Sequence, residues 1–202
     1  MQDTYNALSP EELRLINDAD FFRLKNEITH KIEASLAVLG ENISDILHRH
    51  VKQIPRGILK IAPKISQGER YLDLPWLILD YPRVFSGDDV LAFRSMFWWG
   101  KYFSFTIHLS GKYLEPVKRK LTDNISTLHN KDFYLCINKD PWQHHFEKSN
   151  YRLLDELNSE EKTSIINDAK FIKLGRKLPL NSFTKMIDYG AETYKEFTEM
   201  LW

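Results

Sequence analysis

The segment Ala92–Leu109, AFRSMFWWGKYFSFTIHL, constrains what this chain can fold into more than any other segment does. Its residues alternate in character, which is typical of β-strands whose successive side chains point to opposite faces of a sheet. One of the two alternating sets is apolar and comprises Phe93, Phe97, Trp99, Phe103, Phe105, Ile107 and Leu109. The other alternating set mixes aromatic rings with Arg, His and hydroxyl groups and comprises Arg94, Trp98, Tyr102, Ser104, Thr106 and His108. We therefore predict a β-hairpin that turns near Gly100, with one face on a core and the other on a wetter, ligand-binding side.

The N-terminal region predicts two helices. Ser9 is a preferred helix cap, Pro10 fits the first helical position, and Glu12 is placed to complete a capping box. Apolar residues then recur at spacings of three and four from Phe21 to Leu47, which predicts a long amphipathic helix. Gly40 is the point at which we expect this helix to be interrupted, because glycine costs about 1 kcal/mol inside a helix.

Strands and short helices are predicted after this region. Val51–Arg70 is expected to be an irregular connection containing one short strand. Tyr71–Tyr81 is predicted to be a strand, and Pro75 within it indicates an edge strand or a bulge. Asp132–Asn138 is predicted to be a further strand. Helices are expected over Tyr113–Ile125, Ser149–Leu157, Ser159–Ala169 and Ser182–Trp202, whereas Phe171–Leu180 is consistent with either a strand or a loop.

The order of helices, then strands, then helices predicts an α+β fold. Consecutive strands without crossover helices pair in an antiparallel sheet, which we expect the N- and C-terminal helices to cover. A chain of 202 residues is expected to form a single α+β domain over residues 1–202. Because 28 basic residues balance 28 acidic ones, we expect no nucleic-acid partner. We also expect no membrane partner, since no apolar run approaches the roughly 20 residues that span a bilayer. The single cysteine, Cys136, fits a reducing cytosol, so the predicted location is cytoplasmic.

No motif for a cofactor or a metal stands out in the chain. The close histidine pairs, His48 with His50 and His144 with His145, lack the spacing of three or four that places ligands on one helix face. The sequence contains no nucleophile elbow and no glycine-rich phosphate loop. Cys136 is predicted to be inert filling in a strand rather than a nucleophile paired with histidine. We therefore predict neither a metal nor a cofactor.

The polar and aromatic face of the hairpin is the candidate site. Arginine and histidine there would bind a carboxylate or a phosphate, and tryptophan would stack on a planar group. The candidate ligand-binding residues are Arg94, Trp98, Tyr102, His108, Asp80, Arg83, Trp142 and His144. The alternative is that a helix covers this face, in which case a buried Arg94 needs a paired acid, for which Asp80 is the expected partner.

One internal similarity has two explanations. Ser9–Leu24 and Ser159–Leu174 both contain Ile-Asn-Asp-Ala, followed after one residue by phenylalanine. A duplicated module would explain this, but two helix ends stopped by the same Asn-Asp signal is the favoured explanation, because repeat arrays need three or more units.

The layout of the chain resembles that of the YktB-like group of uncharacterised bacterial proteins. Asp20-Phe21-Phe22 leads into a long helix ending in Leu39-Gly40-Glu41, and the connection Ile54–Lys64 is rich in Pro and Lys. The segment Phe171–Pro179, FIKLGRKLP, then precedes one last helix. The resemblance implies a single α+β domain from a bacterium. It implies no activity, because these proteins have no agreed catalytic residues.

Three functions follow from these patterns. The first is a non-enzymatic binding module that takes a small anionic or aromatic ligand on the polar face of the sheet. The second is a hydrolase or transferase in which His108 or His144 acts as general base and Asp80 orients it. The third is a self-association surface in a homodimer, to which the apolar end Met200-Leu201-Trp202 would contribute.

Overall fold

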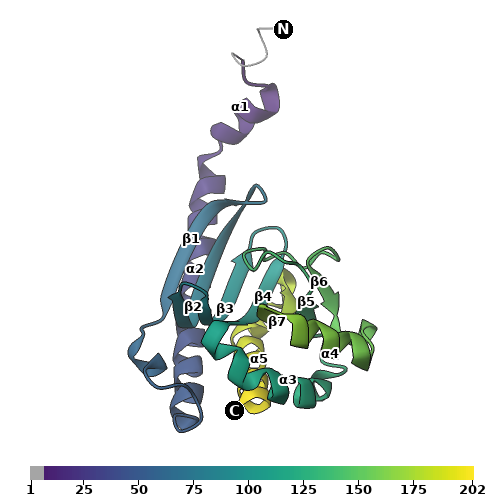
Figure 1. Cartoon of the computed structure of the whole chain (residues 1–202). Coiled ribbons are helices and arrows are strands. Elements are labelled where there is room, and N and C mark those ends of the chain that lie inside the picture. The colour runs from purple at the N-terminus through teal and green to yellow at the C-terminus, as the bar shows by residue number, and fades with distance from the viewer. Residues whose placement is uncertain (1–6) are drawn as a thin grey trace.

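One antiparallel sheet of seven strands organises the structure, a computed structural model that describes residues 7–202 (Figure 1). The strand order is β1-β2-β3-β4-β7-β5-β6, so the predicted hairpin forms β3 and β4 near the middle of the sheet. The strands are β1 (Lys64–Tyr71), β2 (Leu74–Ser86), β3 (Asp89–Trp98), β4 (Tyr102–Ser110), β5 (Tyr134–Cys136), β6 (Tyr151–Leu153) and β7 (Phe171–Pro179). The predicted α+β class is confirmed.

Within residues 7–202, five α-helices accompany the sheet. They are α1 (Pro10–Ile16), α2 (Ala19–Arg49), α3 (Lys118–Asn124), α4 (Ser159–Asp168) and α5 (Met186–Leu201). The N-terminal α2 and the C-terminal α5 contact each other and pack against the apolar face of the sheet, as predicted. None of the helices in residues 7–202 combines the length and apolar character that crossing a bilayer demands.

The apolar set of side chains on the hairpin faces these two helices. Phe93 and Phe105 are buried in a core that also holds Leu39 of α2 and Phe197 of α5. Aromatic rings pack edge to face across this layer, with the Phe93 and Phe197 ring centroids 6.0 Å apart. The prediction that one face of the hairpin lies on a core is therefore confirmed.

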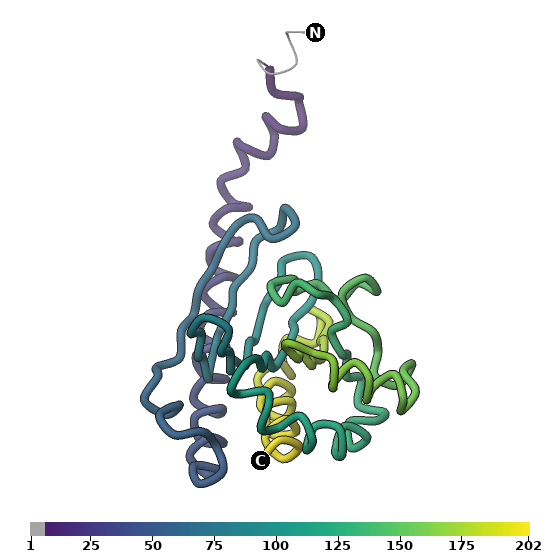
Figure 2. Tube along the Cα trace, viewed as in Figure 1, coloured from purple at the N-terminus to yellow at the C-terminus, as the bar shows by residue number. Residues whose placement is uncertain are grey.

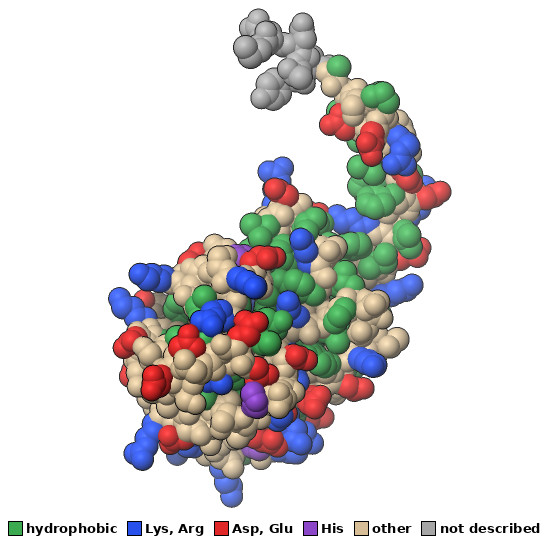
Figure 3. All heavy atoms as spheres, turned by 90° about the vertical axis from the view of Figure 1, so that its right-hand side faces the viewer, with side chains coloured by type: hydrophobic (Ala, Val, Ile, Leu, Met, Phe, Trp, Pro, Cys, Tyr) green, Lys and Arg blue, Asp and Glu red, His purple; other side chains and the backbone are tan. Residues whose placement is uncertain are grey.

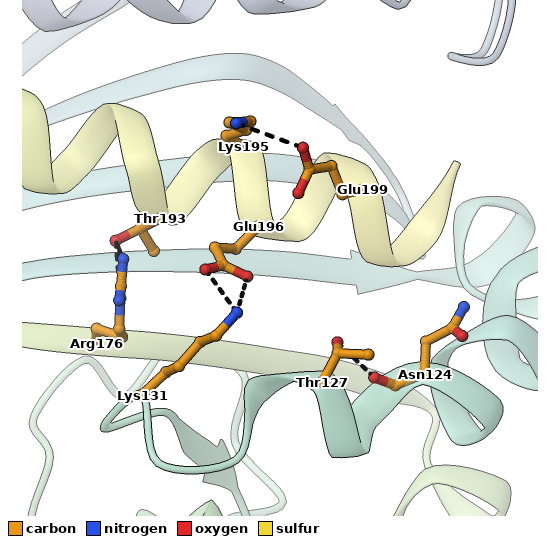
Figure 4. Close-up of polar contacts among 8 residues, drawn as sticks. All are labelled: Asn124, Thr127, Lys131, Arg176, Thr193, Lys195, Glu196 and Glu199. Carbon is orange, nitrogen blue, oxygen red and sulfur yellow. Dashed lines mark hydrogen bonds and ion pairs between the residues drawn. The ribbon is translucent and has the colours of Figure 1, made fainter.

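Helix α5 is also attached by polar contacts (Figure 4). The buried guanidinium of Arg176, on β7, donates two hydrogen bonds to the Thr193 hydroxyl, at 3.0 and 2.7 Å. Lys131 reaches both carboxylate oxygens of Glu196, at 2.8 and 2.7 Å. These contacts join α5 to β7 and to the segment before β5.

The helix start at Ser9 is confirmed, and the interruption at Gly40 is wrong. The Ser9 hydroxyl accepts from the Glu12 amide, and the Glu12 carboxylate accepts from the Ser9 amide. Helix α2 is 31 residues long and continues through Gly40 without a break. Tertiary packing of the adjacent turns outweighs the local cost of glycine, because Leu39 and Ile43 on either side of it are fully buried in the core.

Several element predictions need correction. The strand expected within residues 51–70 is present as β1 and is longer than expected, with eight residues, whereas residues 149–157 form β6 and a short 3₁₀ helix instead of an α-helix. The helix expected over residues 113–125 is broken into 3₁₀ turns, with α3 covering only its last part. The ambiguous segment 171–180 is mostly β7, which lies between β4 and β5. Pro75 lies in β2, opposite an irregularity of β1 between Gly68 and Tyr71, so the bulge interpretation is confirmed.

The two Ile-Asn-Asp-Ala segments do not share a structure. Helix α1 ends at Ile16 with Asn17 as its cap, whereas α4 continues through the corresponding Asn-Asp to Asp168. Phe21 then lies in α2, but Phe171 begins β7. Four shared letters do not fix a conformation when the packing around them differs, which counts against a duplicated module.

The C-terminal end is buried within the chain itself. Met200 and Leu201 belong to the main core, and Trp202 packs against it. This apolar end is therefore covered within its own chain, because α5 turns its apolar stripe onto the sheet, and its part in a homodimer stays a prediction.

Candidate functional site

The polar face of the sheet is covered by the segment between β5 and β6, residues 137–150, rather than by a helix. Two tyrosine hydroxyls hold this segment by accepting hydrogen bonds from its backbone. The Tyr71 oxygen accepts from the amides of His144 and His145, at 2.6 and 2.9 Å. The Tyr102 oxygen accepts from the amide of Phe146 at 2.8 Å. Tyrosine side chains thus replace the ladder bonds that this irregular segment lacks.

An ion pair lies beneath this cover. The register of β2 and β3 places Asp80 opposite Arg94, and their contacts measure 2.8 and 2.9 Å. A third contact joins Arg94 Nη1 to His144 Nε2 at 2.8 Å. Both charged side chains are mostly buried, so the acid predicted for Arg94 is present.

A second cation, Lys173 of β7, lies on the same face without a carboxylate partner. Its Nζ donates to the backbone carbonyls of Pro141 and Gln143. No ion pair found within residues 7–202 includes it. Only 3% of Lys173 is exposed. Burial lowers the pKa of Lys173 to about 8, with a further lowering from Arg94, whereas Cys136 and Asp140 act in the opposite direction.

Two neutral histidines complete the basic surroundings. Burial, reinforced by Lys173 and Arg94, lowers the pKa of His108 to about 3. Burial and then Arg94 lower the pKa of His144 to about 2. Both rings are therefore uncharged at neutral pH, and which ring nitrogen donates depends on the tautomer.

These groups surround a small cavity of about 20 Å³. Its polar walls come from β3, β4, β6, β7 and the covering segment, and its lining residues include Arg94, Thr106, His108, His144, Tyr151 and Lys173. The buried hydroxyl of Tyr151 has no hydrogen-bond partner in the described part of the chain, although Thr106 partly offsets the rise that burial causes in its pKa. The cavity has room for about one water-sized group.

The cavity brings together only part of the predicted site. Arg94, His108 and His144 line it, and Asp80 joins them through Arg94. Trp142 lies at the rim, with its ring centroid 5.8 Å from that of His108 and 52% of the residue exposed.

The other predicted residues have structural contacts elsewhere. Trp98 is buried away from the cavity, where its indole donates to the Tyr71 carbonyl. Tyr102 holds the covering segment. Arg83 extends towards β1 and donates to the Ala62 carbonyl at 3.0 Å, so it does not join the site.

Lys173 and Tyr151 were not predicted as site residues. The alternation of polar Lys173 with apolar Ile172 and Leu174 was a signal for a strand. That signal alone did not place Lys173 at the site. The pairing of β7 with β4 does so, because it puts Lys173 opposite His108. No local pattern marked Tyr151.

The chemistry of two other predicted groups differs from a catalytic arrangement. Both Asp80 oxygens are engaged by Arg94, and no hydrogen bond within residues 7–202 joins Asp80 to a histidine. The Cys136 thiol points towards oxygens of Asn138 and Asn150, and burial raises its pKa. Over that same range, no cluster of three or more His, Cys, Asp or Glu side chains is arranged to hold a metal ion.

No family model, curated protein or solved structure matches this chain. The resemblance to the YktB-like proteins therefore stays a prediction.

Proposed function

We propose that this chain is a non-enzymatic binding module for a small monovalent anion. The ligand would occupy the cavity between the sheet and residues 137–150. One observation carries the proposal: a buried cation without a carboxylate and a buried hydroxyl without an acceptor line the same cavity, from Lys173 and Tyr151. Within residues 7–202, the Lys173 ammonium has no carboxylate partner and the Tyr151 hydroxyl has no hydrogen-bond partner.

The energetics of burial favour an anion over a neutral ligand. A buried ammonium group is costly unless a negative charge or good acceptors compensate it. Two of the three donors of Lys173 are used by the carbonyls of Pro141 and Gln143, which leaves one donor for a ligand. Tyr151 supplies a second donor. Arg94 is already neutralised by Asp80, so its role is to keep the wall in position.

The size of the cavity restricts the ligand. A volume of about 20 Å³ suits a halide, and a planar ion such as nitrate or formate would require residues 137–150 to shift slightly. An aromatic ligand does not fit this volume. The predicted aromatic partner is therefore the weaker of the two ligand classes.

Thermal unfolding at constant ionic strength tests the proposal. We expect chloride, bromide, nitrate or formate to raise the melting temperature relative to gluconate, which is too large for the cavity, since a ligand that binds only the native state stabilises it. Lys173→Met and Tyr151→Phe should each reduce this increase. Tyr194→Phe is the matched control, because Tyr194 is another buried hydroxyl without a partner, in the core on the opposite face.

The outcomes separate a site from a general salt effect. An increase that is equal in wild type, Lys173→Met and Tyr151→Phe would mean that the anions act on the surface as a whole, which overturns the proposal. An absence of any difference between chloride and gluconate would also overturn it.

The contacts do not favour the alternative of a hydrolase or transferase. A histidine with a pKa of about 3 or 2 is a weak base near neutral pH, and neither predicted ring is oriented by a carboxylate in the described structure. For the location, the reducing cytosol is the compartment that we propose, because Cys136 is a buried free thiol.

A further inference from the structure

The N-terminal residues 7–24 project from the body as a helical arm (Figures 1 and 2). The arm comprises α1 and the first turns of α2. Helix α1 has seven residues, and none of them is buried. Isolated helices of this length are marginal in water, so most of their stability must come from packing against something else.

The arm carries the apolar stripe of α2 beyond the part that the protein covers. Along α2, Ile32 and Leu36 are 4% and 0% exposed, whereas Phe21 and Leu24 on the same side are 46% and 55% exposed. The spacing of three and four continues through both halves, which makes them one face of one helix. Further exposed apolar side chains on the arm are Leu8, Leu13, Leu15, Ile16 and Phe22. Hydrophobic side chains are visible along the arm among charged ones (Figure 3).

We propose that a second copy of this chain covers the arm, with the two arms antiparallel about a two-fold axis. The charge distribution favours this partner. Residues 7–20 contain four acidic residues and one basic one, whereas residues 21–31 contain three basic residues and one acidic one. Antiparallel pairing about an axis near the junction of α1 and α2 places Glu11 and Glu12 of each copy near Arg23 and Lys25 of the other, and a two-fold axis makes the contact self-complementary.

The body offers a place for the end of the partner's arm. A groove of about 210 Å³ lies beside residues 25–33 of α2, with walls that include Thr29, Glu33, Trp76 and Trp99. Antiparallel pairing about an axis near the junction of α1 and α2 brings residues 7–10 of the second copy alongside residues 25–28 of this stretch.

Two ion pairs within the chain engage part of the basic half. Arg23 contacts Asp20 at 2.5 Å, and Lys25 contacts Glu69 at 2.8 Å. Both side chains of the Arg23–Asp20 pair are exposed, and Glu69 is the exposed member of its pair with Lys25. Surface ion pairs of this kind contribute little to stability. Exchanging them for contacts with a partner therefore offers little resistance to dimer formation.

Sedimentation equilibrium of the full chain tests the proposal. We expect a dimer at micromolar concentration, and we expect Leu24→Asp to raise its dissociation constant at least about 100-fold, because two copies of the charge enter one apolar interface. Val38→Asp is the matched control. Val38 is exposed on α2 outside the arm, so its substitution should leave the dimer intact. Circular dichroism of both variants checks that the body stays folded.

A charge exchange tests the direction of pairing. Glu11→Lys should raise the dissociation constant about fivefold, and adding Arg23→Glu should restore it, because the two positions face each other only in an antiparallel dimer. A chain that remains monomeric at high concentration overturns the proposal, as does a dimer that Leu24→Asp leaves unchanged. A dimer that Glu11→Lys weakens and Arg23→Glu does not restore contradicts the antiparallel arrangement.

Discussion

Arg94 and Asp80 lie opposite each other on β3 and β2, and their side chains form a two-pronged ion pair under the covering segment. The pair neutralises a charge that the sheet would otherwise bury alone. His144 then adds a contact from the covering segment to the same guanidinium, which links the cover to the sheet.

Removing one member of this pair should destabilise the protein strongly. We expect Asp80→Ala to lower the free energy of unfolding by about 2–4 kcal/mol, because it leaves Arg94 charged and largely buried. Asp80→Leu combined with Arg94→Met should recover much of this loss, since apolar replacement removes both charges. Urea denaturation provides the measurement. Asp123→Ala is the control, because its contact with Arg119 is a long surface pair. An equal loss in Asp80→Ala and the double variant would contradict this account.

Two glycines in helices should respond in opposite directions to alanine. At Gly190 of α5 a Cβ atom would lie 2.6 Å from a Phe105 ring carbon and 2.8 Å from a Leu39 methyl carbon. We expect Gly190→Ala to destabilise by about 1–3 kcal/mol through overpacking. At Gly40 the nearest atom, in Leu79, would be 3.6 Å away, which is ordinary contact. Gly40→Ala should therefore stabilise by about 0.5–1 kcal/mol.

Thermal melts of the two glycine variants decide this comparison. Equal effects at both positions would show that α5 packs less closely against β4 than the distances at Gly190 indicate.

Stability should fall as the pH is lowered below about 6.5. Burial depresses the pKa of His108 to about 3 and that of His144 to about 2, so the unfolded chain binds protons that the native state rejects. Their contribution is fully present above the unfolded value of about 6.5 and is lost progressively as the pH falls towards the folded values. Each histidine contributes a slope of at most about 1.4 kcal/mol per pH unit.

Urea titrations between pH 7.5 and pH 5 measure this slope before most carboxylates titrate. His108→Asn should reduce the slope, whereas a substitution of the exposed His30 by Gln should leave it unchanged. If His108→Asn keeps the full wild-type slope, burial of this ring is not its source.

The thiol of Cys136 should react slowly in the native state. It is buried, and burial raises its pKa, so little reactive thiolate forms. We expect a thiol reagent such as DTNB to modify it at least about 100-fold faster in denaturant than in buffer. Ser159→Cys supplies an exposed thiol for comparison within the same protein. Rapid modification of Cys136 in buffer would show that residues 137–150 open readily.

The sequence alone determined the hairpin, the chemistry of its two faces and the acid that accompanies Arg94. These features are local or nearly so. Strand alternation depends on neighbouring residues, and the cost of burying a guanidinium indicated a nearby carboxylate before any contact was known.

The tertiary structure decided what covers the polar face and which groups meet beneath it. Residues 137–150 have no periodicity that predicts their position, and Lys173 reaches the cavity only because β7 pairs with β4 across a long stretch of chain. It also decided which apolar end remains uncovered. Leu201 and Leu24 have the same local character, but α5 packs on the sheet while the arm extends past it. Burial depends on distant partners, and single-sequence patterns do not contain that information.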